Sequence, residues 1–122
     1  MSLLIFQFIF LLFEKKYNNV IDRVDALNQY AYRYLRVDTN LRSNCFIKML
    51  TKIPKADFHP IRVEAYTKSL HNKLVDTPKI ISSQALSIEV IPYENLWELV
   101  MDILYKNLKE ERGIDLRPEK SK

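Results

Sequence analysis

Apolar side chains recur at alternating intervals of four and three residues over the first third of this 122-residue chain. Because an α-helix has 3.6 residues per turn, side chains at this spacing lie on one helix face. The pattern predicts a long amphipathic helix over residues 14–36 and favours a mainly helical fold. The residues that form the run are Phe13, Tyr17, Val20, Val24, Leu27, Ala31 and Tyr34.

The segment before this helix, residues 3–13, is apolar except for Gln7. No Gly or Pro separates it from the heptad run, so we expect it to form the buried first half of the same helix. A strand buried in the core and a membrane-surface anchor are the alternatives; a spanning helix needs about 20 apolar residues, roughly twice this length. A small domain can hardly cover a helix that is apolar all round, and exposed apolar patches often mark partner surfaces. The candidate partner surface is Leu4, Phe6, Phe8, Phe10, Phe13 and Tyr17.

Three further helices follow from periodicity and from the placement of proline and glycine. One covers residues 41–53 and is ended by Pro54, because a proline disfavours helical backbone in the residue before it. The next covers residues 60–75, and the last covers residues 93–111, with Gly113 as its stop signal. Trp97 lies on the apolar stripe of the last helix and should anchor it to the core.

Residues 79–91 are rich in β-branched side chains and predict one short extended element before the last helix. The predicted fold class is therefore mainly α, with about four helices and one short extended element. We expect residues 1–112 to form a single helical domain, or a fragment of a larger helical protein, and residues 113–122 to form a charged, flexible tail.

Glycine and cysteine each occur once, which limits the kinds of site the chain can build. Glycine-rich phosphate loops need glycines that allow positive φ or close backbone approach, and Gly113 alone cannot supply them. A single cysteine, Cys45, excludes an internal disulfide framework and a cysteine-based zinc site. A reducing, cytoplasmic setting is the expectation.

Positive charge is concentrated in the middle of the chain, where residues 33–79 carry ten Lys and Arg against four Asp and Glu. Such a field can attract nucleic acid, anionic lipid or an acidic protein surface. Arg33, Arg36 and Arg42 surround the predicted turn between the first two helices and form the candidate anion patch. Tyrosines alternate with these arginines from residue 30 to 36, but on a helix they point in different directions, which favours aromatic packing over base stacking.

The residues that could support catalysis are too scattered in the sequence to predict an active site. His59 and His71 are twelve residues apart, without the spacing of a helix-borne zinc site. Cys45 has no neighbouring base to activate it and is expected to pack in or near the core. Three carboxylates on the last helix, Glu94, Glu98 and Asp102, share one face that we expect to be solvated. We therefore predict a non-enzymatic chain with no metal or cofactor.

The stretch from Cys45 to Trp97, which ends Ile91-Pro92-Tyr93-Glu94-Asn95-Leu96-Trp97, resembles the C-terminal helical portion of larger helical-repeat proteins. The resemblance covers less than half of the chain and carries no functional residue across. It implies that the apolar N-terminal segment would pack on a preceding helical layer.

These observations predict a non-catalytic protein–protein interaction or structural module, in the form of the C-terminal end of a helical array. It would bind a protein partner or a second copy through its N-terminal helix. The alternative is a nucleic-acid-binding protein that uses the basic middle segment. Attachment to a membrane surface through residues 3–13 is a third hypothesis.

Overall fold

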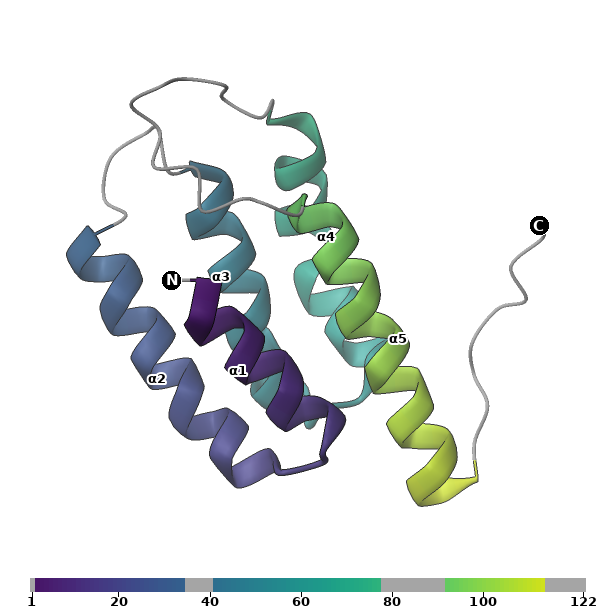
Figure 1. Ribbon diagram of the computed structural model, residues 1–122. Helices are drawn as coiled ribbons and strands as arrows, with labels where there is room; N and C mark the ends of the chain where they lie inside the picture. Colours follow the sequence, from purple (N-terminus) through teal and green to yellow (C-terminus); the bar gives the residue numbers. More distant parts are fainter. Residues whose placement is uncertain (1, 35–40, 78–91, 114–122) are drawn as a thin grey trace.

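The computed structural model describes residues 2–34, 41–77 and 92–113, and these segments form a bundle of five helices (Figure 1). Successive helices run in alternating directions, so that α1, α3 and α5 point one way and α2 and α4 the other. The predicted mainly α fold is confirmed. The helices are α1 (Ser2–Phe13), α2 (Tyr17–Tyr34), α3 (Leu41–Lys55), α4 (Pro60–Asp76) and α5 (Tyr93–Arg112).

The predicted continuous N-terminal helix is wrong, because the chain turns back on itself at residues 14–16. Lys15 has a φ of 61°, in the left-handed region that closes many helices. The backbone N–H of Lys16 donates to the carbonyl O of Leu11 at 3.0 Å, and the N–H of Lys15 donates to that of Leu12 at 3.1 Å. These bonds satisfy the last carbonyls of α1 with no glycine in the corner. The described residues therefore form five helices rather than the four predicted.

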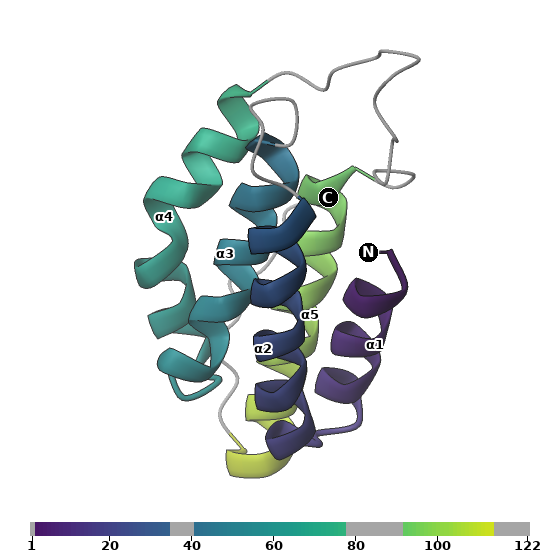
Figure 2. The same ribbon diagram turned by 90° about the vertical axis from the view of Figure 1, so that its left-hand side faces the viewer.

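This corner places α1 at one edge of the bundle, where it contacts α2 and α5 (Figure 2). One face of α1 then enters the core, and its side chains at 3- and 4-residue spacing are buried: Ile5, Phe8, Ile9 and Leu12. Val20 and Leu27 of α2 are also buried, so the heptad run does mark the inner face of that helix.

Helix α3 lies at the centre of the bundle and contacts α2, α4 and α5. Phe46, Met49, Leu50 and Ile53 are fully buried along it. It continues one residue past Pro54, where the sequence predicted its end, because the N–H of Ala56 still donates to the carbonyl O of Lys52 at 3.0 Å.

The last two helices agree with prediction to within one residue at each end. Trp97 is 5% exposed, so its predicted role as an anchor of α5 is consistent with its burial. Gly113 has a φ of 68°, and its N–H donates to the carbonyl O of Lys109 at 2.8 Å, as expected of a helix stop. The extended element predicted at 79–91 lies outside the described residues, and so do residues 114–122 of the predicted tail.

Replacing Lys15 by Gly tests the corner between α1 and α2. Left-handed backbone costs a residue with a side chain about 1 kcal/mol more than glycine, so Lys15→Gly should raise the melting temperature by a few degrees. Loss of the exposed ion pair between Lys15 and Glu110, at 3.4 Å, should offset little of this gain.

Lys16→Gly is the matched control and should lower the melting temperature, because glycine there only adds freedom to the unfolded chain. In a continuous helix both substitutions would destabilise by about 1 kcal/mol. Equal losses in thermal unfolding would therefore contradict the corner.

Candidate functional site

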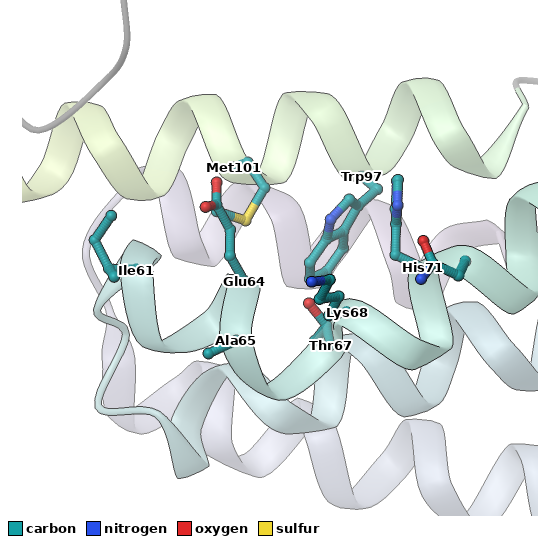
Figure 3. Close-up of a pocket in the computed structure, with 9 residues that line it drawn as sticks. Ile61, Glu64, Ala65, Thr67, Lys68, His71, Trp97 and Met101 are labelled. Carbon is teal, nitrogen blue, oxygen red and sulfur yellow. The ribbon is translucent and has the colours of Figure 1, made fainter.

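A groove of about 500 Å³ runs between α4 and α5 (Figure 3). Trp97 and Met101 contribute its α5 wall, and Ile61 and Ala65 contribute apolar surface from α4. The polar side chains that line it all come from α4: Glu64, Thr67, Lys68, His71 and Asn72. The groove therefore combines apolar side chains from both helices with polar side chains from α4 alone.

Two of the polar side chains of this groove, Glu64 and Thr67, are hydrogen-bonded within the bundle. The Tyr105 hydroxyl donates to Glu64 Oε1 at 2.9 Å, which joins α5 to α4 at one end of the groove. The Thr67 hydroxyl donates to the carbonyl O of Val63 at 2.7 Å within its own helix. Among the described residues, no three His, Cys, Asp or Glu side chains gather closely enough to hold a metal ion.

A second candidate site is the outward face of α1, where large apolar side chains remain uncovered. Leu3, Phe6, Phe10 and Phe13 are 48–68% exposed, and their 3- and 4-residue spacing places them in one line along the helix. We call this line the α1 stripe. The Nζ of Lys106 lies 4.3 Å from the ring centroid of Phe13, so the stripe borders α5. Leu99, two turns before Lys106, adds a fifth exposed apolar side chain on the same side of α5.

The exposed part of these five side chains amounts to roughly 500 Å² of apolar surface. That is near the upper end of the largest apolar patch on an ordinary monomeric protein, and patches of this size are often functional. Of the two candidates, the α1 stripe is the larger continuous apolar surface.

The structure divides the six predicted partner-surface residues between exposed, half-buried and buried positions. Phe6, Phe10 and Phe13 are exposed, as a partner surface requires. Phe8 is fully buried in the core and Leu4 is half-buried, because α1 turns one side toward α2 and α5. Leu3 and Leu99 complete the exposed patch, and prediction missed both. The spacing of Leu3 from Phe6 could have indicated the first, whereas Leu99 depends on how α5 packs beside α1.

Tyr17, the sixth of these residues, belongs to the corner of the bundle rather than to the exposed surface. Its ring stacks on Phe58 with centroids 4.4 Å apart, and its hydroxyl donates to Glu111 Oε1 at 2.6 Å. Burial, together with the carboxylate of Glu111, raises the pKa of Tyr17. The tyrosine therefore joins the start of α2 to the end of α5.

The three arginines of the predicted anion patch do not form one exposed cluster. Arg42 is 8% exposed, and its Nη1 donates to the carbonyl oxygens of Leu74 at 2.8 Å and Thr77 at 2.7 Å. Its Nη2 donates to the carboxylate of Glu94. Arg33 is exposed near the end of α2, and Arg36 lies outside the described residues. Arg42 thus serves the fold, because it satisfies the last carbonyls of α4 and pairs with the first turn of α5.

Neighbouring contacts strengthen this junction of three helices. The hydroxyls of Ser43 and Tyr93 are 2.8 Å apart in the core, and the rings of Phe46 and Tyr93 stack with centroids 4.8 Å apart. Glu94 was predicted to lie on a solvated face with Glu98 and Asp102; it is instead bound by Arg42, whereas Glu98 is exposed. Sequence alone gave no signal for this junction, since its members are distant along the chain.

The remaining candidate residues occupy packing positions. Cys45 is buried, its Sγ donates to the carbonyl O of Leu70 at 3.0 Å, and burial raises the pKa of the thiol, which disfavours the reactive thiolate. His59 precedes α4 as its N-cap residue, as expected of a helix start, and His71 lines the groove. Among the described residues, no helix is both long and apolar enough to span a membrane.

Comparison with known proteins gives no match to a family model, a curated protein or a solved structure.

The Arg42–Glu94 pair predicts a specific dependence of stability on pH. Burial raises the pKa of Glu94, but the hydrogen bond and positive charge of Arg42 outweigh it, so the net shift is downward. The folded-state pKa then lies below the unfolded value of about 4.3. The ionised carboxylate thus stabilises the fold at neutral pH, and this contribution disappears as the pH falls through the folded pKa.

Glu94→Gln should lower the free energy of unfolding by about 1 kcal/mol near neutral pH, a value discounted for the partial exposure of the carboxylate. The deficit should shrink below about pH 4, where the parent carboxyl is also protonated. Glu14→Gln, at an exposed position, is the control and should change little. A deficit that stays constant in denaturant titrations from neutral to acidic pH would show that Arg42 does not depend on this charge.

Proposed function

We propose that this chain is a non-catalytic helical interaction module that binds a protein surface through the α1 stripe. The observation that carries the proposal is the line of Leu3, Phe6, Phe10 and Phe13, which stays exposed although the opposite face of α1 is buried in the core. Exposed aromatic side chains in one row provide a large contact area at low entropic cost, because phenylalanine has only two side-chain torsions to fix.

The rigidity of the α1 stripe, as well as its size, supports its role as a binding surface. The side of α1 opposite the stripe is fixed by Ile5, Phe8 and Leu12 in the core. The Asn107 amide Nδ2 donates to the carbonyl O of Leu12 at 2.9 Å and holds the end of α1 on α5. A preorganised row of anchors binds with less ordering cost than a row on a loose segment.

Nucleic-acid binding through the basic middle segment is the weaker hypothesis. It relied on Arg33, Arg36 and Arg42 as one cluster, and the guanidinium of Arg42 is already engaged with two carbonyl groups and one carboxylate inside the bundle. Binding to any residual basic surface should be weak and should fall steeply with salt.

The test compares the parent chain with Phe6→Ser/Phe10→Ser. We expect the parent either to self-associate in sedimentation experiments or to bind an apolar fluorescent dye, because the stripe must be covered by something or remain available. The double variant should lose most of either signal and keep its helical circular dichroism, since both side chains are about half exposed and lie outside the core.

Tyr66→Ser/Val75→Ser is the matched control, because both residues are large and exposed on α4. This variant should behave as the parent does. A parent chain that is monomeric at high concentration and binds no dye would overturn the proposal.

A further inference from the structure

A charged stripe on α5 runs beside the α1 stripe. Its members are spaced by four, four and three residues and therefore share one side of the helix: Glu98, Asp102, Lys106 and Lys109. Lys106 lies over the ring of Phe13, and Asn107 is hydrogen-bonded to the end of α1, so the two helices are in direct contact. They also run in the same direction (Figure 1). We call the two stripes together the α1–α5 face.

The charges along α5 are ordered. The half nearer the start of α5 is acidic, with Glu98 and Asp102. The other half is net basic, because Lys15, Lys106 and Lys109 outnumber Glu110, which pairs with Lys106 at 2.9 Å and with Lys15 at 3.4 Å. A surface with opposite net charge at its two ends is complementary to itself only when it is turned end over end.

We infer that the α1–α5 face is occupied by a second copy of this chain, related by a two-fold axis that lies in the interface and crosses the helices. This inference rests on the proposed function and names its partner. Such an axis places α1 against α1 of the second copy and α5 against its α5, both antiparallel. The apolar stripes then cover each other, and the acidic half of each α5 faces the basic half of the other.

The other two-fold arrangement lacks this complementarity. An axis along the helices keeps the copies parallel, so that either like charges on α5 meet or the α1 stripe is covered by the charged stripe. Like charges brought together across an interface are unfavourable, and apolar side chains gain nothing against solvated charges. An isologous antiparallel contact satisfies both stripes at once.

The area is also adequate for a dimer. A standard interface buries about 800 Å² on each partner. The exposed apolar side chains of this face provide roughly 500 Å², and the charged stripe of α5 extends the contact along one side of them. The arrangement of an apolar core and a charged rim is usual for stable interfaces.

An anionic membrane surface fits this face less well. Positive charge at Lys106 and Lys109 would favour anionic lipid, but Glu98 and Asp102 at the other end would oppose it. Membrane binding is therefore an outcome that the test must distinguish.

The test uses charge reversal at two exposed positions, Glu98→Lys and Lys109→Glu, with sedimentation equilibrium as the measurement. In an antiparallel dimer, positions 98 and 109 of the two copies face each other at two symmetry-related contacts. Each single variant therefore places like charges opposite one another at both contacts. Each should raise the dimer dissociation constant by roughly tenfold at low salt, with a smaller effect at high salt. An equimolar mixture of the two variants restores opposite charges at both contacts and should dimerise about as well as the parent. The double variant within one chain should do the same.

Four results would overturn the inference, each in a different way. A monomeric parent that still binds apolar dye would reject the second copy and leave the interaction surface in place, whereas a monomer without dye binding would reject the proposed function as well. A dimer that is indifferent to both single reversals would reject the antiparallel arrangement. A monomeric parent that floats with vesicles of anionic phospholipid, but not with neutral vesicles, would assign the face to lipid. Circular dichroism melting of each variant checks that loss of association is not loss of folding.

Discussion

The left-handed turn at Lys15 controls how much of the apolar N-terminal segment the bundle can bury. By reversing the chain, it places α1 against α2 and α5, and four of its side chains enter the core. A five-helix bundle of this size can surround its central helix, α3, but not a helix at its edge. The turn therefore both completes the core and fixes which apolar side chains stay outside, namely those of the α1 stripe.

The opposite end of the bundle is held by a different kind of interaction. Arg42, at the start of α3, binds the last carbonyls of α4 and the first-turn carboxylate of α5, where the peptide dipoles of the two helices favour these contacts. One buried guanidinium thereby fixes the two helix ends that residues 78–91 connect. Removing the carboxylate of Glu94 would leave the buried guanidinium of Arg42 without its counter-charge, which is unfavourable. Arg42, which the sequence pattern placed in a surface anion patch, is thus part of the framework of the helix bundle.

Sequence periodicity predicted α3, α4 and α5 well because each has a proline or glycine signal near an end and one apolar face. It failed at residues 14–16 because the corner contains no glycine or proline, and three polar residues are also common in the middle of a helix. Phe8 could not be separated from Phe6 and Phe10 by sequence, since α1 is apolar all round and only its neighbours decide which side is inside. The role of Arg42 depends on contacts with α4 and α5, and its partner Glu94 is 52 residues away in the sequence. The exposure of Leu99 beside the α1 stripe depends on how α5 packs against α1. No local sequence pattern encodes either arrangement.

The arrangement of two copies along the α1–α5 face is tested most directly by a distance between them. A spin label on Asn95→Cys, an exposed position near the start of α5, reports this distance in a Cys45→Ala background. The antiparallel dimer predicts labels more than about 20 Å apart in the homodimer, because each lies about eight residues from the middle of the charged stripe at 1.5 Å per residue. Labels at Asn95→Cys and Lys109→Cys on different copies should be much closer. A short distance between the two Asn95 labels would show parallel copies and contradict the account.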